Sequence, residues 1–364
     1  MTIPDRDDRQ RIAEAVADAG ARVDSGAAAG ALRVCGEGSK ALRFATAGLD
    51  MPASTGAQRL STLDHHGLLH YAPDELVLEA RSGTPLRDVE ALLAQNDQVL
   101  PFEPPRLGGR GTLGGAVAAG LSGPARPWRG SVRDAVLGVE LVNGRGEILR
   151  LGGRVVKNVA GYDLSRLQAG ACGSFGVLLS VAVRVLPAPT MTLTVHQQHD
   201  LEPALALLAT LPARALRLTG AAGLAGVVSL RLAGAPRAVS TAARELGGEH
   251  AEGDHLWTAL RDQTHSFFSA GAVRWRASLP LASGAMPGDA QALIEWGGAQ
   301  RWYRAAEDAV TPPAELVAAV VAAGGRLEDA RRPSWCQVDG PRAQLQARLR
   351  EAFDPAGLFV TEAG

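Results

Sequence analysis

Lysine is almost absent from this sequence. The chain of 364 residues carries 37 lysines and arginines together, and the lysines among them are Lys40 and Lys157. The ammonium group of lysine is a compact point charge, whereas the guanidinium of arginine is a broad planar fork, so the two do not replace each other beside a crowded ligand. The two lysines are therefore either a product of chance or markers of positions that need a small cation.

Cysteine is also scarce. The three cysteines, Cys35, Cys172 and Cys336, are far apart and form no C-x-x-C pair. An iron–sulfur cluster or a structural zinc site needs several clustered cysteine ligands, so neither group is expected in this chain. Few, scattered cysteines are typical of a protein in a reducing compartment.

Long apolar runs and an excess of charge of one sign are missing as well. No run approaches the ~18–20 apolar residues that cross a bilayer. The net charge of −1 gives no reason to expect binding to nucleic acid or to an anionic membrane surface. The charged stretch at residues 5–9 is followed by no apolar segment, so a secretory signal is not expected. We therefore expect a cytoplasmic protein without direct membrane insertion, with any membrane association made through partner subunits.

The length, the composition and the pattern of apolar residues predict two globular domains. The length suffices for two cores, and 46% hydrophobic residues is ordinary for a soluble fold. Up to residue 188, strand-like runs alternate with glycine-dense stretches, and after Pro187-Ala188-Pro189 alanine-rich helices alternate with strands. This pattern predicts an α+β protein, with a first domain over residues 1–188 and a second α+β domain over 189–364. The expected strands are 31–34, 76–80, 135–142, 148–151, 177–186, 191–196, 227–232, 273–279 and 293–296, and the expected helices are 10–20, 86–95, 203–211, 239–246 and 313–323.

Two glycine-rich turns about 70 residues apart carry the chemistry. The first is Gly36-Glu37-Gly38-Ser39-Lys40, and the second begins at Gly111-Thr112-Leu113-Gly114-Gly115. Glycine lets backbone N–H groups approach a ligand without an intervening Cβ, and successive N–H groups in such turns form a concave anion site. Either turn alone is compatible with an ordinary loop. Two facing turns suit a pyrophosphate that joins two nucleoside halves.

A nicotinamide site is the main rival interpretation of the second turn. Residues 109–114 match G-x-G-x-x-G, but a Rossmann site needs a strand immediately before the motif and a long helix after it. The preceding residues 101–105 contain three prolines, which a central strand does not tolerate. The following residues are interrupted at Gly120, Gly123 and Pro124. These features disfavour a Rossmann site.

The residues around the second turn resemble the FAD-linked 2-hydroxyacid oxidoreductases, which share the fold of vanillyl-alcohol oxidase and p-cresol methylhydroxylase (PCMH). The likeness is carried by residues 111–120, by Lys157-Asn158-Val159-Ala160-Gly161-Tyr162-Asp163 and by Gly173-Ser174-Phe175-Gly176-Val177. Residues 120–128 are similar to the FAD-binding E subunits of glycolate oxidases. Residues 353–359 resemble the family's C-terminal signature, which in relatives lies against the flavin domain.

The resemblance implies a two-subdomain PCMH-type FAD-binding domain followed by a smaller cap domain whose C-terminal segment returns to the flavin domain. It also implies that FAD is bound without a covalent link, since the first turn lacks the histidine that tethers flavin in some relatives. The residues it places around FAD are Gly36, Gly38, Ser39, Lys40, Gly111, Thr112, Gly114, Gly115, Ala118, Ser122, Gly123, Lys157, Gly176 and Val177.

The sequence departs from the larger family members in one respect. Those enzymes carry a histidine-rich active-site motif in the C-terminal half, and here the histidines of that half are scattered. No catalytic residue and no metal site is therefore assigned. We expect a flavoprotein subunit of a multi-subunit glycolate (2-hydroxyacid) oxidase or dehydrogenase, working with a larger homologous flavoprotein subunit and an iron–sulfur subunit. The alternative is an electron-relay or structural subunit that supports the larger catalytic one.

Overall fold

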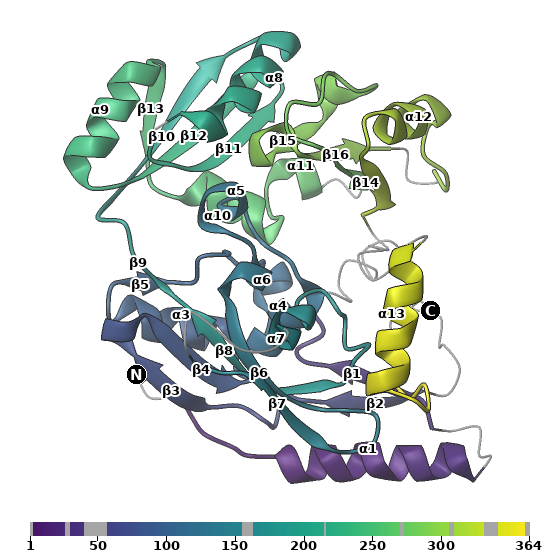
Figure 1. Ribbon diagram of the computed structural model, residues 1–364. Helices are drawn as coiled ribbons and strands as arrows, with labels where there is room; N and C mark the ends of the chain where they lie inside the picture. The colour runs from purple at the N-terminus through teal and green to yellow at the C-terminus, as the bar shows by residue number, and fades with distance from the viewer. Residues whose placement is uncertain are drawn as a thin grey trace. The chain divides into compact units, whose positions relative to one another are not determined.

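The computed structural model describes residues 3–25, 30–39, 57–154, 163–214, 216–269, 273–305, 309–330 and 341–360 (Figure 1). The chain divides into two compact units. The first consists of Met1–Leu121, Ser131–Ala188 and Ser334–Gly364, and the second of Ser122–Gly130 and Pro189–Pro333.

A five-stranded antiparallel sheet forms the centre of the first unit. Two of its three inner strands, Val136–Val142 and Val177–Arg184, are apolar along nearly their whole length because the sheet is covered on both faces. Leu141 and Val181 pack into one core cluster, while Val142 and Leu179 pack into another. The strand order is β3 (Leu68–Ala72), β4 (Val77–Arg81), β8 (Val177–Arg184), β6 (Val136–Val142) and β7 (Ile148–Gly152).

Short helices pack on one face of this sheet, and the terminal segments pack on the other. In the first cluster, apolar residues of the helices meet the strands. In the second, Ile12 and Val16 of α1 (Arg9–Asp24) meet Leu32 and Leu358. Figure 1 shows the purple α1 beside β1 and β2. The helices of the first face are α3 (Leu86–Ala94), α4 (Leu113–Ala119), α6 (Val132–Ala135) and α7 (Leu164–Leu167).

The C-terminal residues 341–360 fold into the first unit. Phe353, at the end of α13 (Pro341–Phe353), stacks on Phe175 with ring centroids 5.8 Å apart. The carboxylate of Asp354 accepts hydrogen bonds from the backbone N–H groups of Leu358 and Phe359, at 2.9 Å each. Leu358 in turn accepts a backbone bond from Leu32. The segment therefore adds to the edge at β1 (Leu32–Cys35), which pairs in parallel with β2 (Gln58–Ser61). A further short pair joins β5 (Gln98–Val99) to β9 (Leu186–Pro187).

The second unit is built on one eight-stranded antiparallel sheet. Its main core lies between this sheet and three helices, which are α8 (Leu201–Thr210), α9 (Pro236–Leu246) and α12 (Ala314–Ala322). A smaller cluster on Trp257 and Trp302 involves α10 (His255–Asp262) and α11 (Ser266–Ser269). The strand order is β13 (Glu249–Glu252), β10 (Met191–Gln198), β12 (Val227–Gly234), β11 (Leu218–Leu224), β15 (Leu293–Glu295), β16 (Gln300–Arg304), β14 (Val273–Ser278) and β17 (Arg326–Asp329).

The second unit also buries charged groups. The guanidinium of Arg301 is fully enclosed and bonds to the carboxylate of Asp289, which also accepts a hydrogen bond of 2.8 Å from the Tyr303 hydroxyl. Burial, together with the neighbouring Asp289 carboxylate, raises the pKa of the Tyr303 hydroxyl. The hydroxyl therefore stays protonated and donates, which keeps the buried carboxylate satisfied.

The fold class expected from the sequence, α+β with an antiparallel sheet in the second part, is confirmed. Several strands were not predicted, among them β11, which holds Gly220. A Cβ at Gly220 would lie 2.8 Å from the ring of Trp257, so glycine is needed there for packing. Glycine inside a strand weakens the sequence signal of that strand.

Candidate functional site

The two glycine-rich turns of the first unit lie against each other. The first turn follows β1, and the second leads into α4. A Cβ added to Gly36 would lie 2.6 Å from Oγ1 of Thr112, so the first turn touches the second through a position that must stay free of a side chain. Gly38 has a φ of +69°, and a Cβ there would meet nothing within 4 Å. The need for glycine at Gly38 is therefore conformational, because only glycine adopts this φ without strain.

The start of α4 is organised around Thr112. Its side-chain oxygen accepts the backbone N–H of Gly115 at 3.1 Å and so caps the helix. Gly114 packs against the residue that follows β4, since its added Cβ would lie 2.5 Å from Cβ of Ser82. Gly115 has no such neighbour: its Cβ would approach only the Thr112 hydroxyl, at 3.0 Å. Glutamate or glutamine is favoured at this third helical position, so the glycine is not explained by helix stability.

A carboxylate joins the two turns. Oε2 of Glu37 accepts the backbone N–H of Gly111 at 2.5 Å, and Oε1 accepts a hydrogen bond of 3.2 Å from Arg87 of α3. The Glu37 side chain is 15% exposed, whereas that of Arg87 is 55% exposed. The sequence interpretation did not single out either residue, although a glutamate between two turn glycines is an unusual choice beside an expected anion.

The two turns fit the diphosphate of FAD. Gly38 and Gly115 leave space where side chains would stand. The backbone N–H groups of Glu37 and Gly38 donate to no other described residue, and both residues are partly exposed. Free N–H groups beside glycines form the concave environment that binds phosphate oxygens. Ser39 is buried next to them. Lys40, predicted for the same site, lies outside the described residues.

Residues 82–84 hold the second turn in place through backbone hydrogen bonds. The carbonyl of Ser82 accepts the N–H of Gly114, and the carbonyl of Thr84 accepts that of Leu113, each at 2.9 Å. Gly83 cannot carry a side chain, because a Cβ would lie 1.9 Å from the carbonyl oxygen of Thr62. The position of the second turn therefore depends on the backbone immediately after β4.

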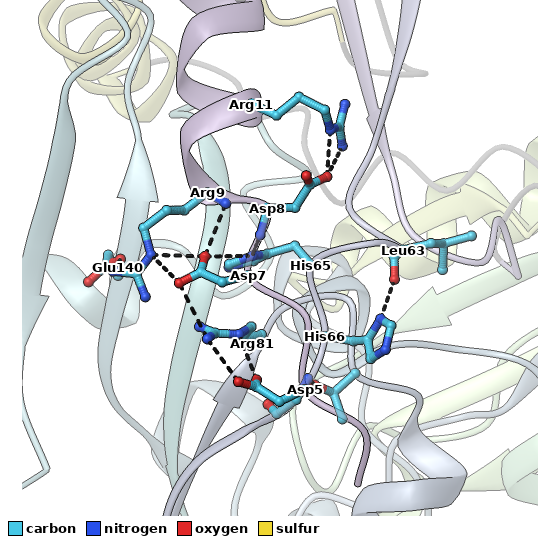
Figure 2. A network of polar contacts seen from close by, with 12 residues as sticks. Asp5, Asp7, Asp8, Arg9, Arg11, Leu63, His65, His66, Arg81 and Glu140 are labelled. Carbon is cyan, nitrogen blue, oxygen red and sulfur yellow. Dashed lines mark hydrogen bonds and ion pairs between the residues drawn. The ribbon is translucent and has the colours of Figure 1, made fainter.

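A partly buried polar network holds this support in place (Figure 2). Arg81, which directly precedes Ser82, bonds Asp5 at 3.0 Å and pairs with Asp7 at 3.3 Å. His65 is 1% exposed, and its Nδ1 accepts the backbone N–H of Asp8 at 3.0 Å. Arg9 links Asp7 to Glu140 on β6. The N-terminal segment is thereby tied to the strands that carry the site.

The protonation states in this network follow from its geometry. Since Nδ1 of His65 accepts an N–H, the ring is neutral with its proton on Nε2. Burial and the charge of Arg81 lower the pKa of His65 accordingly. Burial alone would raise the pKa of Asp7, but hydrogen bonds from Arg9 and the charge of Arg81 outweigh it, and the net pKa is lowered. The contact of 3.5 Å between His65 and Asp7 is therefore not a charged pair near neutral pH.

The loop 168–176 packs on the end of α4. The N–H of Gly170 bonds the carbonyl of Val117 at 3.0 Å, and that of Cys172 bonds the carbonyl of Ala118 at 2.9 Å. The carbonyl of Ala118 is thus engaged within the fold. Cys172 takes part in a disulfide bond, which the scattered cysteines did not suggest, whereas Cys35 is a free thiol.

Packing and backbone conformation within the fold explain why glycine and valine occupy positions 176 and 177. Gly176 has a φ of +137°, and its Cβ would lie 2.4 Å from the carbonyl oxygen of Val142. The Val177 side chain is fully buried with Ile12 and Leu358. A contact with flavin through their backbone atoms stays a prediction.

Ser122 and Gly123 belong to the second unit, unlike the other described site residues. The carbonyl of Gly123 accepts the indole N–H of Trp296 at 3.1 Å, and the guanidinium of Arg126 stacks 4.5 Å above the same indole. These contacts fix the segment 122–130 to the turn that follows β15. Lys157, the remaining predicted site residue, lies outside the described residues.

Within the part of the chain that the structure describes, no group of three or more metal-ligating side chains is found. Two histidines of the second unit make local hydrogen bonds: His196 contacts the Ser229 hydroxyl at 2.9 Å, and His265 accepts the N–H of Phe267 at 3.2 Å. None of the described helices has the length and apolar character needed to cross a membrane.

Comparison with known proteins agrees with this geometry. Residues 16–152 match the model of a family described as an FAD binding domain. The chain is 40% identical over 305 residues to the glycolate oxidase subunit GlcE of Escherichia coli (strain K12), covering 83% of this chain and 85% of that protein. It is also 40% identical over 78 residues to the glycolate oxidase subunit GlcD of Bacillus subtilis (strain 168), which is 21% of this chain and 17% of that protein.

A solved structure shows the same fold. An alkyldihydroxyacetonephosphate synthase superposes with a TM-score of 0.65 at 13% identity, covering 95% of this chain and 74% of that one. The chain therefore belongs to the family of the FAD-binding glycolate oxidase subunit GlcE, flavin-dependent oxidoreductases with the fold of vanillyl-alcohol oxidase and p-cresol methylhydroxylase.

Proposed function

We propose that this chain is the FAD-binding subunit of a multi-subunit enzyme that oxidises a small 2-hydroxyacid, glycolate, to glyoxylate. The observation that carries the proposal is the 40% identity to GlcE over 83% of the chain. The oxidation removes two electrons and two protons from the substrate. FAD, when bound, supplies the two-electron acceptor, and the electrons then leave for a partner subunit.

The residues of this chain bind and orient the cofactor. The two turns hold the diphosphate without a covalent link to the flavin. Gly176 and Val177 contact the flavin half through their backbone atoms. Residues 189–364 are proposed as a cap domain whose C-terminal segment returns to the flavin domain, as expected from the sequence. The residues proposed to contact FAD are Gly36, Gly38, Ser39, Lys40, Gly111, Thr112, Gly114, Gly115, Ala118, Ser122, Gly123, Lys157, Gly176 and Val177.

The partners are a larger homologous flavoprotein subunit and an iron–sulfur subunit. The local match to GlcD, itself a glycolate oxidase subunit, supports the first. The second follows from the sequence, since three scattered cysteines do not make a cluster site and electrons from FAD need a further acceptor.

The hydrogen bonding of the histidines in the second unit favours a second candidate function. General-base catalysis needs a group that can reach the substrate proton, and three histidines of the second unit, His196, His199 and His265, are engaged in local hydrogen bonds. In this alternative the chain is an electron-relay or structural flavoprotein, and the larger subunit oxidises the substrate.

One experiment tests both candidates. The purified chain is made anaerobic, mixed with glycolate, and its flavin absorbance near the visible maximum is followed, first alone and then with the two partner subunits. Bleaching of the isolated chain supports catalysis by its own flavin. Bleaching only in the complex supports the relay function. No bleaching in either sample, with FAD present, would reject glycolate as the substrate.

The nature of the cofactor is tested separately. Acid precipitation of the purified chain should release FAD into the supernatant. Release of FMN, or a flavin that stays with the pellet, would contradict a non-covalent dinucleotide.

A further inference from the structure

The carboxylate of Glu37 connects three separate segments of the first unit. It belongs to the first turn, accepts the backbone N–H of Gly111 in the second turn, and bonds the guanidinium of Arg87 on α3. The bond to Gly111 spans 74 positions in the sequence and that to Arg87 spans 50. A side chain that is 15% exposed and engaged at both oxygens has a fixed position.

This arrangement is unexpected on electrostatic grounds. An anionic side chain in a turn that binds a diphosphate would repel the ligand. Arg87 removes this conflict, because its charge lies 3.2 Å from the carboxylate. The pair as a whole is neutral and can stay in place when an anion binds nearby.

We propose that Glu37 and Arg87 form a clamp that holds the two glycine-rich turns at the separation needed for the diphosphate of FAD. This inference rests on the proposed placement of FAD between the turns. Glu37 is a positioning residue: it fixes the backbone of the second turn through the Gly111 N–H. Arg87 neutralises the carboxylate and keeps it directed at Gly111. The clamp orders the site before FAD arrives, so less ordering remains to be done on binding.

Four variants separate the two parts of the clamp. Glu37→Ala removes the tie to Gly111. Glu37→Gln keeps an oxygen that accepts the Gly111 N–H but removes the charge. Arg87→Met keeps an apolar stem and leaves the carboxylate unneutralised. The double variant combines Arg87→Met with Glu37→Gln. The matched control is Glu328→Gln, a buried carboxylate of the second unit that also bonds two arginines, Arg276 and Arg326.

The measurement is the dissociation constant of FAD for the apoprotein, from quenching of flavin fluorescence at about 0.05 M and 0.5 M salt, with unfolding curves for every variant. We expect Glu37→Ala to weaken FAD binding on the order of tenfold, or about 1.4 kcal/mol, and Glu37→Gln to restore most of it. Arg87→Met should weaken binding at low salt and less at high salt, because salt screens the exposed charge. The double variant should bind better than Arg87→Met alone.

A purely structural role would not produce the salt dependence or the recovery in the double variant. Wild-type affinity in both Glu37→Ala and Arg87→Met would overturn the clamp. Tighter binding by Glu37→Ala would also overturn it, since the carboxylate would then compete with the diphosphate. The variant Gly115→Asp separates a failure of the clamp from a failure of the proposed FAD placement. If Gly115→Asp and the clamp variants all bind FAD normally, the diphosphate lies elsewhere. If Gly115→Asp loses FAD while the clamp variants bind it normally, the placement holds and the clamp is wrong.

Discussion

Gly115 offers the sharpest test of where the diphosphate lies. It occupies the third position of α4, where its N–H is capped by Thr112. An acidic residue there is compatible with the helix and interacts favourably with its amino end, by roughly 0.3–1 kcal/mol. The added Cβ would approach only the Thr112 hydroxyl, at 3.0 Å, a contact that a shift of a few tenths of an ångström relieves without breaking the cap. The substitution Gly115→Asp should therefore leave the fold intact.

The effect on FAD is expected to be large. A carboxylate about 5 Å from one phosphate charge, at an effective dielectric constant of about 20, is repelled by about 3 kcal/mol. Two phosphate charges double this value, and partial exposure and salt reduce it. We expect the dissociation constant of FAD to rise by at least about a hundredfold, equivalent to about 2.7 kcal/mol.

The assay compares two neighbouring glycines. Flavin content after purification and fluorescence titration of the apoprotein report binding, while circular dichroism and urea unfolding report the fold. Gly115→Ala, without a charge, should bind FAD far better than Gly115→Asp. Gly114→Ala should instead lower stability, because its Cβ would lie 2.5 Å from Ser82. A folded Gly115→Asp protein with the affinity of Gly115→Ala would refute the reasoning.

Three further predictions concern the fold around the site. Gly176→Ala should lower the free energy of unfolding by more than about 2 kcal/mol, because it adds a Cβ 2.4 Å from the Val142 carbonyl oxygen in a backbone conformation that disfavours alanine; a change below about 0.5 kcal/mol in urea unfolding would contradict this. The pKa of His65 is lowered by burial, so the native state binds fewer protons than the unfolded state, and the contribution of His65 to stability should be complete above about pH 6.5 and decline as the pH falls below it. His65→Gln should flatten that decline between pH 7 and 5, and equal slopes for both proteins would disprove it. Tyr303→Phe removes a donor from the buried carboxylate of Asp289 and should destabilise the protein by about 1–3 kcal/mol, with unchanged FAD binding as the check that the effect is local to the second unit.

The sequence correctly predicted those helices and strands whose apolar pattern is contained in one short segment. The apolar run at 177–186 predicted a strand, and β8 covers Val177–Arg184 because both faces of its sheet are buried. The strand β11 was missed because Gly220 makes room for Trp257, a residue 37 positions later. Packing between distant residues thus hid a strand that local propensity could not recover.

By itself the sequence determined the two glycine-rich turns, their suitability for a dinucleotide and the resemblance to FAD-linked oxidoreductases, because glycine spacing and backbone conformation are local properties. Only the tertiary structure showed which of these glycines are required by packing within the fold. Gly114 faces Ser82 and Gly176 faces Val142, whereas Gly115 has the Thr112 hydroxyl as its one close neighbour. The tertiary structure also brought Glu37 to Gly111 and Arg87. Contacts between residues 50 or more positions apart leave no periodic trace in a single sequence, so a side chain that joins two turns becomes visible only when the chain is folded.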